Sequence, residues 1–122
     1  MFIEVTDTNK ENVAVNAKFI VKVVSSILSS NARIFLNDNV VIVCKESYDN
    51  IRDKIFSDGS GKFVEVESED ANIILNVDYI IKFEKYYFRS DITRVVVASD
   101  DQPVIPVLGT FEEVRNLIYK AL

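Results

Sequence analysis

The sequence predicts an α+β protein built from two tandem ββββα repeats, with antiparallel sheets and one helix closing each repeat. Two observations carry this prediction. Residues 62–122 read as a diverged copy of residues 1–56, and each copy passes from short β-branched runs to one amphipathic segment. The copies match in four blocks in the same order: residues 2–5 with 63–66, 16–22 with 76–82, 32–36 with 93–97, and 47–52 with 110–115.

The domain organisation follows from the segment between the copies. Residues 57–61 are Ser-Asp-Gly-Ser-Gly, a composition typical of a flexible linker. Five residues reach at most about 18 Å, so residues 1–56 and 62–122 must be neighbours. A unit this small buries a limited share of its surface. We therefore expect the two repeats to share a core or to pack as a pseudo-symmetric pair.

The first copy contains recognisable strand, turn and helix signals. Its apolar runs predict strands over residues 1–6, 13–24, 32–36 and 40–44, the second with a bulge or bend at 16–18. The turn formers at residues 37–39 predict a tight hairpin between the last two strands. A helix is expected to begin at Ser47, because Tyr48, Ile51 and Ile55 recur at helical spacing.

The second copy has a stronger helix signal and a weaker fourth strand. Thr110 and Glu113 have the spacing of a capping box. The expected apolar stripe of that helix comprises Phe111, Val114, Leu117, Ile118 and Leu122. Two prolines, Pro103 and Pro106, flank the fourth strand and each lacks an amide donor, which places that strand at a sheet edge.

Composition argues against most enzyme classes. The 122 residues are 48% hydrophobic and 27% charged, which is typical of a globular chain. No apolar run is long enough to span a bilayer and no secretory pattern opens the chain, so we expect a cytoplasmic protein without membrane contact. No histidine is present, and Cys44, the single cysteine, lies in an apolar run. We therefore expect no enzymatic activity, no cofactor and no metal site.

Charge is divided unevenly between the copies. Residues 1–56 hold seven basic and seven acidic residues, whereas residues 57–122 hold seven and twelve, which accounts for the net charge of −5. This balance disfavours a general phosphate-binding surface. Glu65, Glu67 and Glu69 alternate and are interpreted as a solvated strand face, while Asp100 and Asp101 are interpreted as turn residues.

Several motifs of the first copy resemble the short flagellar FlbD-like proteins. These are Ile-Glu-Val-Thr at residues 3–6, Val-Asn at 15–16, Arg-Ile-Phe-Leu at 33–36, Asn-Asp-Asn at 37–39 and Lys-Glu-Ser at 45–47. The strand order and the serine-capped helix are more loosely similar to LytTR-type DNA-binding domains. The first resemblance covers half of the chain and implies a small non-enzymatic accessory protein. It supplies no catalytic residue.

One segment combines basic and aromatic side chains. Residues 82–94 contain Lys82, Lys85, Tyr86, Tyr87, Phe88, Arg89 and Arg94, where the first copy has Val-Ser-Ser-Ile-Leu at residues 24–28. Two interpretations stay open for the aromatics. They extend the core between the repeats, or Lys82, Lys85, Tyr86, Tyr87 and Arg89 form a surface for a partner.

The sequence thus predicts a small regulatory or accessory protein that binds a protein partner. One alternative is a nucleic-acid-binding module of LytTR-like type, which requires an exposed basic face over residues 82–94. The other is an acidic inhibitor of the phage type that mimics DNA, which requires rows of carboxylates on one surface. The sequence leaves the identity of the partner and the oligomeric state open.

Overall fold

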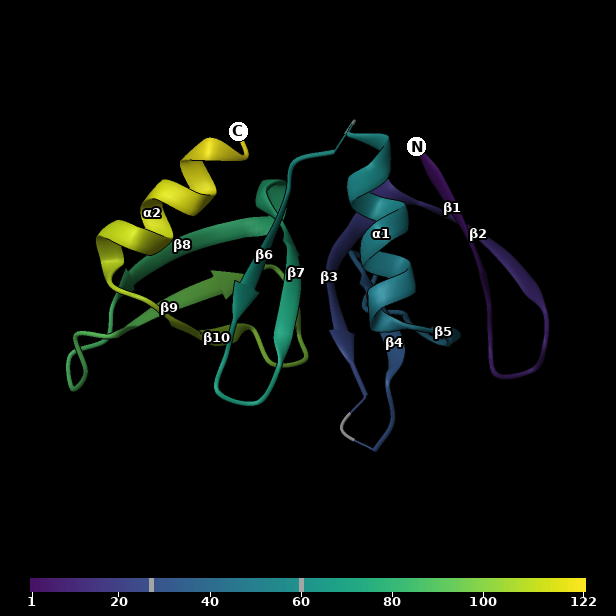
Figure 1. The fold of residues 1–122 in the computed structure, drawn as a ribbon, viewed down its shortest axis with the longest axis horizontal. Coiled ribbons are helices and arrows are strands. Elements are labelled where there is room, and N and C mark those ends of the chain that lie inside the picture. Colours follow the sequence, from purple (N-terminus) through teal and green to yellow (C-terminus); the bar gives the residue numbers. More distant parts are fainter. Residues whose placement is uncertain (27, 60) are drawn as a thin grey trace.

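The computed structural model describes residues 1–26, 28–59 and 61–122, and it confirms an α+β fold with antiparallel sheets and two helices (Figure 1). Ile27, between the predicted strands 13–24 and 32–36, and Ser60, in the predicted linker 57–61, lie outside the described residues. The first half comprises β1 (Phe2–Thr6), β2 (Asn12–Asn16), η1 (Ala17–Phe19), β3 (Ile20–Ser25), β4 (Asn31–Leu36), β5 (Val41–Ser47) and α1 (Tyr48–Asp58). The second half comprises β6 (Phe63–Glu67), β7 (Asn72–Asn76), η2 (Val77–Tyr79), β8 (Ile80–Lys85), β9 (Ile92–Val97), β10 (Val104–Leu108) and α2 (Phe111–Lys120).

The element order is the same in both halves, but each half has one strand more than the sequence predicted. A short 3₁₀ turn, η1 or η2, divides the expected second strand at the position of the predicted bend. The side chain of Asn16 accepts a hydrogen bond from Lys18 N at 3.1 Å, and Asn76 accepts one from Asp78 N at 3.0 Å. Such local bonds compete with strand pairing, so the chain turns and continues in a second strand.

The two halves share one sheet. The central sheet has the order β5-β4-β3-β7-β6, while β1-β2 and β10-β9-β8 form two smaller sheets. The halves meet where β3 pairs with β7, which we call the seam. There Lys22 pairs with Leu75, Val23 with Ile74 and Val24 with Ile73 in an antiparallel ladder. The remaining pairings repeat in each half: β1-β2, β3-β4 and β4-β5 correspond to β6-β7, β8-β9 and β9-β10. Isolated bridges Asp7–Cys44 and Ser68–Val107 also correspond.

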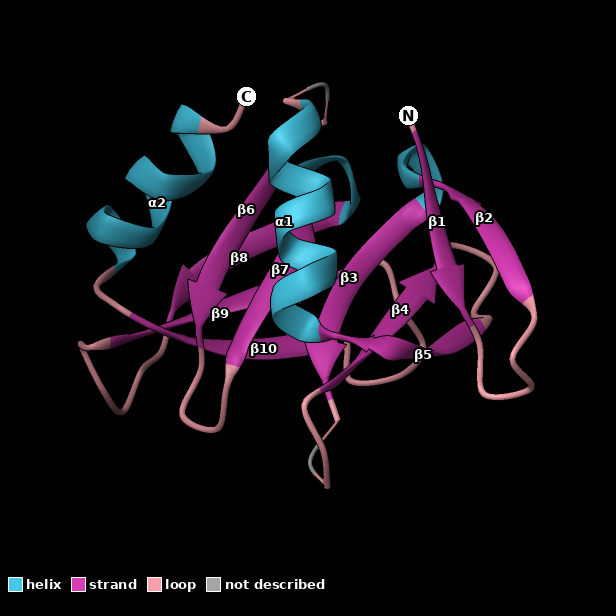
Figure 2. Ribbon diagram, turned by 45° about the vertical axis from the view of Figure 1, so that its right-hand side comes forward, coloured by secondary structure: helices cyan, strands magenta, loops and turns pink. Residues whose placement is uncertain are grey.

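Each hydrophobic core receives residues from the other half. The core under α1 contains Phe63 and Ile74 of the second half, and the core under α2 contains Val21 of the first half. The buried hydroxyl of Tyr48 also crosses the boundary and donates to Glu65 Oε2 at 2.6 Å. Burial and this hydrogen bond raise the pKa of Tyr48. The halves are therefore packed as one pseudo-symmetric pair, as Figure 2 shows from a second side.

Both helices begin where the sequence predicted. Ser47 accepts from Asn50 N at 3.1 Å, and Thr110 and Glu113 form the reciprocal capping box. The predicted stripes are buried at Tyr48, Ile51, Ile55, Val114 and Ile118. Leu117 and Leu122 were predicted wrongly as core residues: both are exposed, because Leu117 projects beside the buried stripe and Leu122 follows the end of α2. Helix α1 also continues to Asp58, two residues into the predicted linker.

Turn and edge signals are confirmed. Asn39 has a φ of 67°, and β4 and β5 pair antiparallel across the turn that contains it. Strand β10, which contains Pro106, lies at the edge of the sheet β10-β9-β8. Strand β5 is longer than expected and runs on to Ser47, the N-cap of α1.

Candidate functional site

The connection between β8 and β9 and the first turn of α2 enclose a hollow of about 680 Å³. Its lining comprises Lys85, Tyr86, Tyr87, Ser90, Ile92, Thr110, Phe111, Glu112 and Arg115. Aromatic contacts shape its surroundings: Phe83 and Phe111 lie 5.3 Å apart between ring centroids, and Tyr87 and Phe88 lie 5.2 Å apart edge to face. The hollow is thus an apolar recess with charged groups on its rim.

Two aromatic side chains beside the hollow are almost fully solvated. Tyr87 is 92% exposed and Phe88 78% exposed, whereas Tyr86 is half-buried. The interpretation that these aromatics extend the core between the repeats is therefore wrong for Tyr87 and Phe88. The reason lies in the topology, because the β8–β9 connection projects from the side of the molecule away from the first half (Figure 1).

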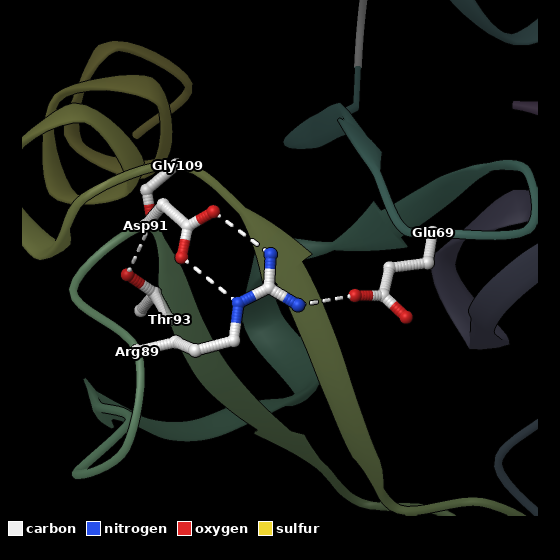
Figure 3. Close-up of polar contacts among 5 residues, drawn as sticks. All are labelled: Glu69, Arg89, Asp91, Thr93 and Gly109. Atoms are coloured by element: carbon white, nitrogen blue, oxygen red, sulfur yellow. Dashed lines mark hydrogen bonds and ion pairs between the residues drawn. The ribbon is translucent and has the colours of Figure 1, made fainter.

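Arg89 fixes the base of this connection (Figure 3). Its guanidinium donates to both carboxylate oxygens of Asp91, at 3.0 and 2.8 Å, and to Glu69 Oε1 at 2.6 Å. These bonds raise the pKa of Arg89, and the bond from Arg89 holds the pKa of Asp91 below its ordinary value. Gly109 N also donates to Asp91 O at 2.7 Å, which ties the connection to the residues just before α2. The loop is held at its base while its aromatic tip stays in solvent.

The five predicted partner-binding residues separate into three groups. Lys85, Tyr86 and Tyr87 line the hollow, whereas Arg89 does not line it and is bound to the carboxylates of Asp91 and Glu69. Lys82 lies outside it, on the exposed edge of β8, with Nζ 3.4 Å from Glu84 Oε2. The ion pairs of Lys82 and Arg89 offset two of the positive charges that a basic face for nucleic acid would need.

Two of the carboxylates that a row on one surface would need are engaged by other side chains. Glu65 accepts from Tyr48 and lies 3.9 Å from Arg52, and Glu69 is paired with Arg89. Glu69 follows the end of β6 instead of continuing the strand, so the expected alternating face stops at Glu67. Within residues 1–26, 28–59 and 61–122, no group of three or more carboxylate or cysteine side chains is placed to hold a metal ion.

Sequence reasoning missed two features of this region. The wall supplied by Phe111, Glu112 and Arg115 was not predicted, since nothing in the sequence brings the start of α2 beside the β8–β9 connection. Lys22 was missed as well: it is buried at the seam, where Nζ donates to Asp101 O at 2.6 Å and Gln102 O at 3.1 Å. The recurrence of lysine at positions 22 and 82 is the one signal that pointed to it.

Cys44 is predicted to be inert in the folded protein. Its side chain is buried, and burial together with Glu46 raises the pKa of the thiol to about 11. At pH 8 only about one thousandth of the thiol is then ionised. Iodoacetamide at pH 8 should leave the native protein unmodified for hours and should alkylate it within minutes in guanidinium chloride, as followed by mass spectrometry. Rapid labelling of the native protein would contradict the buried position.

No helix among the described residues is long and apolar enough to cross a membrane. Comparison with known proteins leaves the resemblance to FlbD-like and LytTR-type proteins as a prediction. No family model, no curated protein and no solved structure matches the chain.

Proposed function

We propose that the protein is a non-enzymatic accessory or regulatory protein that binds a protein partner in the hollow between the β8–β9 connection and α2. The observation that carries the proposal is the solvent exposure of Tyr87 and Phe88 beside an apolar recess. Exposed aromatic clusters of this kind mark interaction surfaces, and tyrosine is among the residues that contribute most to binding energy.

The rim indicates the chemistry of the bound segment. Arg115 lies 3.4 Å from Glu112 and Arg89 is held by two carboxylates, whereas none of the ion pairs among the described residues involves Lys85. A segment with apolar side chains for the recess and one carboxylate for Lys85 fits this arrangement. The support at the base of the loop limits the entropy lost when the partner binds.

Charge favours a protein over a nucleic acid as the ligand. The net charge of −5 and the paired state of Lys82 and Arg89 weaken any attraction for phosphate. The alternative of a DNA mimic is also weakly supported, because Glu65 and Glu69 are engaged by Tyr48 and Arg89. Binding to nucleic acid remains an outcome of the experiment below.

Selection from a random peptide display library tests the proposal. The wild-type protein should enrich peptides that combine apolar residues with an acidic residue. The double variant Tyr87→Ser/Phe88→Ser should bind the same peptides about tenfold or more weakly in fluorescence polarisation. Its free energy of unfolding should change by less than about 0.5 kcal/mol per site, because both side chains are solvated.

A matched control and a competing ligand sharpen the result. Leu28→Ser replaces another solvated apolar side chain, one that does not line the hollow, and should leave peptide binding unchanged. Labelled single-stranded and duplex DNA are titrated at low and moderate salt. Failure to enrich peptides, or tight DNA binding that falls steeply with salt and is lost in Lys82→Ala/Lys85→Ala, would overturn the proposal.

A further inference from the structure

The two strands that pair at the seam between the halves each have an equivalent strand whose outer edge lacks a partner among the described residues. The block matches that relate the repeats make β8 the equivalent of β3 and β2 the equivalent of β7. Strands β3 and β7 pair with each other, whereas among the described residues β8 pairs only with β9 and β2 only with β1. The outer edges of β8 and β2 are therefore equivalent to the two edges that pair at the seam, and no other described strand pairs with them.

Side chains that are buried on β3, which has a partner strand on both edges, have more exposed equivalents on β8, which has a partner on one edge. Val21 of β3 is 0% exposed because it enters the core of the second half, while its equivalent Ile81 on β8 is 64% exposed. On the opposite strands, Ile74 of β7 is buried in the core of the first half and its equivalent Ala14 of β2 is exposed. Ile81 and Ala14 thus occupy the positions that are buried at the seam, but on strand edges that have no partner among the described residues.

The first half has a hollow whose position matches the site that Val21 occupies in the second half. A hollow of about 220 Å³ lies along β2, and its apolar lining comprises Val13, Val15, Phe19, Leu36 and Ile42. The equivalents of these residues in the second half are Ile73, Leu75, Tyr79, Val97 and Ile105. Those five all belong to, or pack against, the core cluster that contains Val21. The hollow beside β2 thus has the position of the site that Val21 fills at the internal seam.

The polar contacts of the seam also have equivalents at the open edges. Asn76 Nδ2 donates to Ile20 O at 2.9 Å across the seam, and the corresponding residues are Asn16 and Ile80. Buried Lys22 donates to the carbonyls of Asp101 and Gln102. Gln102 and Asn39 occupy the same place in their turns, with φ of 50° and 67°. Lys82 would then meet the carbonyls of Asp38 and Asn39.

Charged edge strands commonly prevent association, so Lys82 needs separate consideration. Its equivalent Lys22 is buried within a formed seam and is satisfied there by two carbonyl oxygens, which shows that a lysine at this position is compatible with pairing. The ion pair of Lys82 with Glu84 is exposed and costs little to break.

From these equivalences we infer that the protein binds further copies of itself head to tail, with the β8 edge of one copy added to the β2 edge of the next. Ile81 fills the hollow beside β2, Lys82 lies opposite Val15, and Phe83 lies opposite Ala14, in the register of the internal seam. Because the two edges are different surfaces, the contact closes into a ring or extends as a chain of copies. Ile81, Lys82 and Phe83 do not line the hollow beside α2, although Lys85 at the end of β8 does.

Two variants with one damaged edge each test the inference. Wild-type protein at micromolar to 100 µM concentration should sediment as an assembly larger than a monomer. Ile81→Asp and Ala14→Asp should each weaken self-association about thirtyfold or more, because either carboxylate would be buried without a partner. Mixing the two variants should restore one intact contact and give a 1:1 dimer by native mass spectrometry, with no larger species.

Leu28→Asp is the control, since it places the same charge on a solvated position that lies on neither edge. It should associate like the wild type, and all the variants should keep the circular dichroism of the folded protein. A wild type that remains monomeric at 100 µM overturns the inference. So does association that persists in Ile81→Asp, or a mixture of the two edge variants that stays monomeric.

Discussion

Replacing Ile55 or Ile118 with alanine is expected to lower the free energy of unfolding by about 2–5 kcal/mol. The two residues occupy equivalent positions on α1 and α2, and both are buried against the sheets. Each substitution removes buried methyl groups and leaves a cavity that close packing cannot fully collapse. Urea unfolding followed by circular dichroism measures the change through the midpoint at constant slope.

The result should be the same whichever half carries the substitution. A single sheet runs through both halves and each core includes residues of the other, so one cooperative transition is expected for both variants. Leu117→Ala is the matched control, because Leu117 precedes Ile118 on α2 and is exposed. This substitution should lower the free energy of unfolding by less than about 1 kcal/mol. Equal losses at positions 117 and 118 would show that the packed face of α2 is assigned wrongly.

Local and periodic features could be predicted from the sequence because their causes lie within a few residues. The buried stripes of both helices follow from spacings of three and four, the capping box from Thr110 and Glu113, and the edge position of β10 from its proline. The duplication was visible because matched blocks occur in the same order. The division into residues 1–56, a linker at 57–61 and residues 62–122 remains a prediction.

Features that depend on side-chain geometry or on distant partners could not be predicted. The division of the second strand needed the geometry of the Asn16 and Asn76 side chains, not only their identity. Val21 and Ile81 are similar β-branched residues at equivalent positions, yet one is buried and the other exposed. Their difference is set by whether another strand lies alongside, which no local pattern encodes. The same applies to the wall that α2 contributes to the hollow.

Replacing Val21 with aspartate is expected to lower the free energy of unfolding by about 4 kcal/mol or more, the largest effect of any change considered for this chain. Val21 is fully buried in the core of the second half although it belongs to β3 of the first. A carboxylate there would have to be buried without a partner or would force the seam between β3 and β7 apart. The first outcome buries an uncompensated charge, and the second exposes the core of the second half to water.

The matched variant is Ile81→Asp, which introduces the same side chain at the equivalent position of the open edge. As Ile81 is exposed, this variant should change the free energy of unfolding of the monomer by less than about 1 kcal/mol. Unfolding of Val21→Asp is best measured in the Ile81→Asp background, so that self-association does not contribute to apparent stability. Comparable stability losses at the two positions would mean that the seam is not what joins the halves. A large loss at Val21 alone would identify the pairing of β3 with β7 as the contact on which both cores depend.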